Sequence, residues 1–276
     1  MINLPQNKIM AVLPIRKYFS LNGDLTLCSE FIAAENEGGV YEVIRVIKGI
    51  PIFLEEHLSR FYQSAEIAGN SIPYSSDRIK NILTELISAN ETEEGNILLS
   101  CKTNLKAFFI QHVYPREIEF REGVRCGLLH AERQNPNAKV FQTEVRNMAN
   151  MMISHQGFYE VLLVDEQEQI TEGSRSNVFF IREDELLTPP ASKVLVGVTR
   201  QKTIECASML GLKFKEMEIN VLDLPTCDAL FITGTSPNIL PVSKIGELGF
   251  DVNNHILRKL MQQFDLMITD YLAQKS

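Results

Sequence analysis

Residues 172–200 have the sequence EGSRSNVFFIREDELLTPPASKVLVGVTR, and the organisation of the chain follows from this stretch. An apolar run with β-branched residues, 177–181, comes after a Gly/Ser turn and predicts a buried strand. A charged turn separates it from a second expected strand that begins at residues 186–188 and stops at a Pro-Pro pair. Gly197 precedes an expected helix, and the unpaired N–H groups at such a helix start are typical of an anion site. Glu172, where a strand gives way to a turn, adds a candidate functional carboxylate.

The composition is that of a globular protein without a membrane or nucleic-acid partner. At 276 residues, with 45% apolar and 22% charged residues, the chain can form two modest domains or one large one. A formal net charge of −8 without a compensating basic block argues against nucleic acid. No apolar run approaches the roughly 18 residues of a membrane span, and the N-terminus has no signal-peptide pattern. Five scattered cysteines without a C-x-x-C pair indicate free thiols in a reducing cytoplasm.

Hydrophobic periodicity predicts an α/β protein of the α+β type with two domains. A small α/β domain of antiparallel character is expected over residues 1–118 and a larger one over 119–276, with the charged stretch 115–124 as linker. We expect Ser76 to cap a helix that ends at residue 88. In an expected helix over residues 144–156, we expect Met148, Met151 and Met152 to be buried. Expected helices span residues 54–68, 76–88, 144–156, 200–210 and 254–272. We also expect a hairpin that turns at Lys48-Gly49. In addition to the two strands of the opening stretch, further strands are expected over residues 96–101, 108–114, 159–164, 214–219 and 229–233.

Along its whole length, the opening stretch resembles the signature of the class IV aminotransferases. The matching positions are Glu172, Ser174, Asn177-Val178-Phe179, Leu186-Leu187-Thr188 and Leu195-Val196-Gly197-Val198-Thr199-Arg200. This family comprises fold-type IV enzymes that use pyridoxal 5'-phosphate: branched-chain and D-amino acid aminotransferases and aminodeoxychorismate lyases. The resemblance implies a two-domain fold like that of D-amino acid aminotransferase. It also implies a homodimer, because the family builds its cofactor pocket at a dimer interface.

The resemblance requires a lysine that holds the cofactor as a Schiff base and later moves the substrate's α-proton. In the family this lysine precedes the signature glutamate by about one helix and one strand. Lys139 is the only lysine between Lys106 and Lys193, so it is the single candidate. Its flanking residues are apolar and favour a strand-like position, whereas a solvated surface lysine is the alternative.

The resemblance assigns the other cofactor contacts residue by residue. Glu172 is expected to keep the pyridine nitrogen protonated, which makes the ring an electron sink; alternatively, it only starts a turn. Arg60 matches the arginine of the family's E-H-x-x-R helix, which grips the phosphate; alternatively, it lies on a solvated helix face. The remaining cofactor-binding candidates are Ser174, Asn177, Val198, Thr199 and Thr235.

Candidate substrate-binding residues are Tyr41, Arg45 and Ser236. Tyr41 lies in a strand that resembles the substrate side of the family's pocket, although a core tyrosine explains it almost as well. Arg45 is on the same face of that strand and is suited to meet a substrate carboxylate, but a salt bridge explains it equally well. The histidines show no metal-ligand spacing, so no metal site is expected.

Two departures leave the reaction and the substrate open. The loop 102–106 lacks the Arg-x-His carboxylate trap of D-amino acid aminotransferases. Glu144 stands where branched-chain enzymes place a tyrosine, five residues after the lysine. We expect transamination between small amino acids and 2-oxo acids. An aminodeoxychorismate lyase that releases pyruvate and p-aminobenzoate is the alternative, and a non-catalytic binding protein that kept the fold is a third hypothesis.

Overall fold

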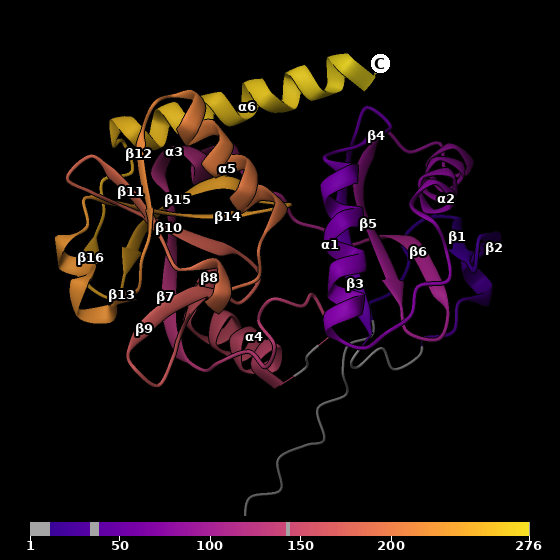
Figure 1. Ribbon diagram of the computed structural model, residues 1–276, viewed down its shortest axis with the longest axis horizontal. Helices are drawn as coiled ribbons and strands as arrows, with labels where there is room; N and C mark the ends of the chain where they lie inside the picture. Colours follow the sequence, from indigo (N-terminus) through magenta and orange to yellow (C-terminus); the bar gives the residue numbers. More distant parts are fainter. Residues whose placement is uncertain (1–11, 34–38, 142–143, 276) are drawn as a thin grey trace, which may run out of the picture.

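The computed structural model describes residues 12–33, 39–141 and 144–275 and has two β-sheets with helices packed on each (Figure 1). The first sheet is built from residues before 111 and the second from residues after 123. None of the described helices combines the length and the apolar character that crossing a bilayer requires.

The first sheet has six strands in the order β2-β1-β6-β5-β3-β4, all antiparallel. In β3 alternate residues are buried because the strand covers the apolar faces of α1 and α2 with one side only. Lys48 and Gly49 both have positive φ, the geometry of a tight two-residue hairpin turn. The elements of this half are β1 (Tyr18–Leu21), β2 (Asp24–Leu27), η1 (Cys28–Glu30), β3 (Val40–Ile47), β4 (Ile50–Pro51), α1 (Leu54–Ile67), α2 (Ser76–Ala89), β5 (Glu94–Cys101) and β6 (Leu105–Ile110).

The second sheet has ten strands in the order β12-β11-β10-β14-β15-β7-β8-β9-β13, with β16 paired to β15. It is mixed, because β7 runs parallel to both β8 and β15. Its elements are α3 (Glu117–Glu122), β7 (Val124–His130), α4 (Glu144–Gln156), β8 (Glu160–Val164), β9 (Gln169–Gly173), β10 (Asn177–Arg182), β11 (Glu185–Thr188), η2 (Ala191–Lys193), α5 (Val198–Met209), β12 (Lys213–Glu216), β13 (Ile219–Asn220), η3 (Val221–Thr226), β14 (Ala229–Gly234), β15 (Asn238–Ile245), β16 (Leu248–Gly249) and α6 (His255–Lys275).

Helix α6 joins the two halves. It lies across the second sheet and extends toward the first half (Figure 1). Near its end, the Tyr271 hydroxyl accepts a hydrogen bond from the Leu54 N–H at 3.2 Å. Lys275 forms an ion pair with Glu55 at 2.9 Å. Its apolar face buries Phe264 and packs around Phe53 from the first half.

Several local predictions differ from the structure. The stretch 115–124 is not a plain linker but contains α3, which forms because Glu119 accepts a hydrogen bond from the Arg116 N–H in a capping box. Ser75, not Ser76, caps α2 through the Arg78 N–H. Strand β6 ends at Ile110 rather than at residue 114. The expected domain boundary between residues 118 and 119 falls inside α3 and stays a prediction.

The burial expected for α4 was wrong. Met148 and Met151 are 43% and 53% exposed, and Met152 is half-buried. Only Ala149 of this helix is buried, because α4 packs on β7 and β8 with a narrow face. The helix itself spans the predicted residues 144–156.

Candidate active site

A cavity of about 520 Å³ lies between the two halves, and both contribute to its walls. The first half supplies residues from β3, α1, β5 and the segment after β6. The second supplies loops at the ends of its strands and the start of α5. The predicted site residues that line it are Tyr41, Arg60, Lys139, Glu172, Ser174, Asn177, Val198, Thr199, Thr235 and Ser236. In the described part of the chain, no group of three or more His, Cys, Asp or Glu residues is placed to hold a metal ion.

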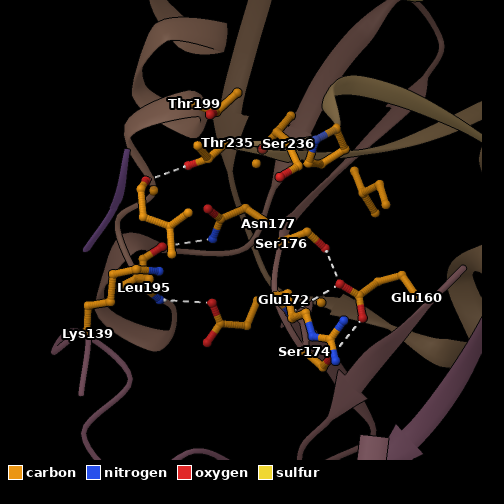
Figure 2. Close-up of a pocket in the computed structure, with 18 of the residues that line it drawn as sticks. Lys139, Glu160, Glu172, Ser174, Ser176, Asn177, Leu195, Thr199, Thr235 and Ser236 are labelled. Carbon is orange, nitrogen blue, oxygen red and sulfur yellow. Dashed lines mark hydrogen bonds between the residues drawn. The ribbon is translucent and has the colours of Figure 1, made fainter. Parts of the chain in front are cut away.

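One end of the cavity is suited to an anion. Helix α5 begins at Val198 without a side-chain cap, so its first N–H groups remain available. Thr199, Thr235 and Ser236 lie together at this end (Figure 2). The N-cap residue is Gly197 because any Cβ there would collide with the side-chain oxygen of Asn177.

The turn that follows β14 at the anion end is tied to the first half. The Thr235 hydroxyl donates to the Val43 carbonyl at 3.2 Å. The Ser236 hydroxyl accepts a hydrogen bond from the Asn96 amide at 2.9 Å. The anion end is therefore built by both halves of the chain.

Arg60 reaches the cavity from a buried charge cluster on α1 and β3. Glu42 binds Arg60 with both oxygens at 2.7 Å and contacts His57 Nδ1 at 2.8 Å. Burial raises the pKa of Glu42, but the charge and hydrogen bonds of Arg60 and His57 outweigh it and lower that pKa to about 2. Burial lowers the pKa of His57. Glu42 therefore stays ionised and fixes the guanidinium of Arg60 at the cavity wall.

Glu172 is buried at the other end of the cavity (Figure 2). One of its oxygens accepts from Arg133 at 3.0 Å and the other from the Leu195 N–H at 3.1 Å. Burial raises the pKa of Glu172, and Arg133 opposes this rise. The carboxylate is thus held in a single orientation toward the cavity.

Lys139 belongs to the chain segment after β7, but its backbone pairs with the first sheet. Its carbonyl accepts from the Tyr41 N–H at 3.0 Å, and its own N–H donates to the Ser64 hydroxyl at 3.0 Å. The ammonium Nζ lies 4.9 Å from the centre of the Tyr41 ring. Burial lowers the pKa of Lys139. For Tyr41, burial raises the pKa, but the positive charges of Lys139, Arg146 and Arg133 lower it to about 8.

Ser174 and Asn177 line the cavity and also shape its walls. Ser174 donates to the buried carboxylate of Glu160 at 2.7 Å. Asn177 donates to the Leu195 carbonyl at 2.8 Å and thereby fixes the loop that leads into α5.

Arg45 is the one predicted site residue that does not line this cavity. Its side chain donates to the Asn238 side chain at 3.3 Å and lies over the Tyr114 ring at 4.2 Å. It borders a much smaller cavity beneath the anion end. Because the pleat places Tyr41, Val43 and Arg45 on one face, Arg45 lies one step beyond the cavity.

The family model "Amino-transferase class IV" matches residues 39–245. The chain belongs to this family. A D-alanine aminotransferase of Listeria monocytogenes is 30% identical over 230 residues, which are 75% of this chain and 78% of that protein. The structure of the Escherichia coli branched-chain amino acid aminotransferase has a TM-score of 0.83 at 21% identity and covers 92% of this chain and 95% of its own. A Legionella pneumophila chain assigned as a 4-amino-4-deoxychorismate lyase has a TM-score of 0.74 at 22% identity and covers 83% and 91%. These two structures show the fold.

This aminotransferase is an enzyme of the fold-type IV class, and its cofactor is pyridoxal phosphate. The donor set of the cavity fits that group. The anion end offers N–H groups, hydroxyls and the guanidinium of Arg60, which suit a phosphate. Glu172 offers a buried carboxylate for a ring nitrogen, and Lys139 offers an amine on the cavity wall.

Sequence reasoning missed several residues that contact or support the cavity. Glu42 lies on the buried face of β3, opposite to the face of Tyr41. A carboxylate on the buried face of an alternating strand is the sequence signal that could have identified it. Arg133 and Glu160 gave no signal, because their partners are distant in sequence. Arg146 and Arg175 also line the cavity.

Proposed function

We propose that this aminotransferase moves an amino group between an amino acid and a 2-oxo acid, with Lys139 as its catalytic residue. The observation that carries the proposal is the presence of Lys139, Glu172 and the anion end on the walls of one cavity. Lys139 would hold the cofactor covalently, Glu172 would face its ring nitrogen, and Arg60, Val198, Thr199 and Thr235 would surround its phosphate.

The proposed mechanism depends on what these side chains do. When bound, pyridoxal phosphate supplies an aldehyde that combines with amines and a ring that accepts the electron pair of the substrate's α-carbon. Lys139 has a lowered pKa, so more of its amine is neutral and able to take that α-proton. Glu172, fixed by Arg133, is suited to hold a proton at the ring nitrogen. Tyr41, beside the amine of Lys139, lies on the substrate side.

The aminodeoxychorismate lyase reaction is the second candidate. It needs the same α-proton removal, so Lys139 and Glu172 would serve both reactions. The two reactions differ in the final proton transfer and in the leaving group. The loop 102–106 is short and lacks an Arg-x-His trap, and this favours a bulky substrate.

We also propose a cytoplasmic homodimer. All five cysteines are free, which agrees with a reducing compartment. Val113, which lines the cavity, is 77% exposed, and Met148 and Met151 on α4 are also exposed. Exposed apolar side chains suit contact with a second copy of the chain.

Cofactor attachment tests the proposed catalytic residue. Purified protein given pyridoxal phosphate should become yellow, and borohydride should fix the cofactor to the chain. Lys139→Ala should abolish this attachment. The matched control is Lys193→Ala, because Lys193 pairs with Asp165 and Glu218 outside the cavity and its loss should leave attachment intact. Attachment that persists without Lys139 would refute the assignment.

A single-turnover experiment separates the two reactions. With an amino donor and no 2-oxo acid, an aminotransferase should accumulate the pyridoxamine form in near-stoichiometric amount. A lyase given aminodeoxychorismate should instead release pyruvate and p-aminobenzoate and keep the pyridoxal form. No pyridoxamine from a broad panel of donors would refute transamination.

A further inference from the structure

The hydroxyl of Ser236 has a proton that can be donated into the cavity. Ser236 lies in the turn after β14 and lines the cavity at its anion end (Figure 2). Its oxygen accepts a hydrogen bond from the side-chain amide of Asn96 at 2.9 Å. Within residues 12–33, 39–141 and 144–275, this is the only hydrogen bond of the Ser236 side chain. Because the oxygen already serves as an acceptor here, the hydroxyl proton is left for a ligand.

The neighbouring hydroxyl, that of Thr235, is used differently. It donates its proton to the Val43 carbonyl at 3.2 Å. A hydroxyl has a single proton, so the Thr235 side chain keeps only oxygen lone pairs for a ligand, and an anionic oxygen needs a donor. A contact of Thr235 with an anion is then left to its backbone N–H. Of the two hydroxyls in this turn, that of Ser236 is therefore the one able to donate to a phosphate or carboxylate oxygen.

The amide of Asn96 is held in one orientation by Tyr114. Asn96 is only 2% exposed, and its side-chain oxygen accepts a hydrogen bond from the Tyr114 hydroxyl at 2.9 Å. Burial raises the pKa of Tyr114, although the charge of Arg45 opposes this rise, so the phenol keeps its proton and remains a donor. With its oxygen bound to Tyr114, Asn96 presents its NH2 group to Ser236.

Arg45 sets the direction of this chain of hydrogen bonds. Its guanidinium lies over the Tyr114 ring, 4.2 Å from the ring centre. The positive charge favours a phenol whose lone pairs face the cation and whose proton points away from it, toward Asn96. Arg45 and Asn96 are direct partners in the pairing of β3 with β5, so their side chains share a face of the sheet and meet the same tyrosine. Donation therefore runs from Tyr114 to Asn96, from Asn96 to Ser236, and from Ser236 into the cavity.

We propose that Asn96 and Tyr114 are positioning residues that aim the Ser236 hydroxyl proton at an anionic oxygen of a ligand in the cavity. That oxygen belongs to the cofactor's phosphate or to a substrate carboxylate, because both offer the same charged acceptor. The inference rests on the proposed function, which brings both groups to this cavity. Asn96 and Tyr114 belong to the first half, whereas Ser236 belongs to the second, so one half orients a donor that the other half carries.

A double-mutant cycle on binding, without turnover, tests whether Asn96 acts through Ser236. The probes are inorganic phosphate on the cofactor-free protein and pentanoate on the cofactor-loaded protein, each titrated by calorimetry. Ser236→Ala should weaken at least one probe about ten- to hundredfold, and the weakened probe identifies the ligand oxygen. Asn96→Ala should weaken the same probe about threefold or more, and Tyr114→Phe should act in the same direction. In the Ser236→Ala background, Asn96→Ala should have almost no further effect, because the hydroxyl that it orients is gone.

Conservative and distant variants complete the cycle. Ser236→Thr keeps the hydroxyl and should keep most of the affinity that Ser236→Ala loses. Ser88→Ala and Asn81→Ala are the matched controls, because both residues are exposed on α2 and neither lines the cavity. Thermal unfolding of every variant checks that the fold is intact.

The outcomes separate this inference from the proposed function. Unchanged affinity for both probes in Ser236→Ala would overturn the donor role of Ser236. Losses that simply add in the double variant would overturn the positioning role of Asn96, even if Lys139 still attaches the cofactor. Failure of cofactor attachment, together with the expected cycle for inorganic phosphate, would instead refute the proposed function and leave Ser236 as an oriented anion donor.

Discussion

Replacing Glu42 with Gln should destabilise the cofactor-free protein by about 3 kcal/mol at neutral pH. Glu42 is fully buried and has Arg60 and His57 as partners. The lowering of its pKa from 4.5 to about 2 corresponds to about 3 kcal/mol of differential stabilisation of the charged form. This agrees with the roughly 3–5 kcal/mol lost when a buried ion pair loses one partner.

The lowered pKa of Glu42 also sets the sign of the pH dependence. Because the folded-state pKa of Glu42 lies below the unfolded value, its stabilisation is complete above about pH 4.5 and disappears as the pH falls toward 2. Urea unfolding of wild type and Glu42→Gln should therefore give free energies that differ most at neutral pH and converge in acid. Glu85→Gln is the control, because the Glu85 side chain is about half exposed and its ion pair with Arg78 is long, at 3.8 Å. A difference below about 1 kcal/mol at pH 7, or one that does not shrink in acid, would refute the reasoning.

Two further predictions concern the cavity. Glu172→Gln keeps the shape but removes the charge that we propose for the ring nitrogen, so turnover should fall about ten- to hundredfold while cofactor affinity changes far less. Steady-state kinetics and cofactor titration measure the two, and unchanged turnover would show that Glu172 is only a turn residue. In cofactor-free protein, the pKa of about 8 for Tyr41 predicts that one tyrosine ionises well before the others as the pH rises. Ultraviolet titration should show this early phenolate in wild type and not in Tyr41→Phe, and its persistence in the variant would contradict the assignment.

The parts of the fold that the sequence predicted are those that depend on local pattern. Helix α4 was predicted at residues 144–156 with its observed bounds, and the Lys48-Gly49 turn gave the hairpin of β3 and β4. The exposure of Met148 was not predictable, because it depends on how much of α4 the sheet covers. Strands β1 and β2 were missed because each has four residues and weak alternation.

The residues of the candidate site also divide into those that local sequence pattern identifies and those that depend on contacts between distant segments. Residues within the signature, such as Glu172 and Thr199, line the cavity as the sequence led us to expect, because their spacing along the chain is fixed. Arg133 was not found, because its hydrogen bond to Glu172 spans 39 positions. Arg45 was predicted as a substrate residue because alternate residues of a strand share a face, which puts it on the same face as Tyr41. The cavity does not extend as far along β3 as Arg45.

The position of Lys139 has a mechanical consequence. Its backbone is fixed to β3 and to Ser64 of α1, both in the first half, whereas Glu172 and the start of α5 belong to the second sheet. Two residues before Lys139, however, the Asn137 amide donates to the Ala191 and Val194 carbonyls of the second half at 2.7 and 2.8 Å. The segment that carries Lys139 is therefore tied to both halves, and these bonds hold Lys139 in place relative to Glu172 if the halves open or twist.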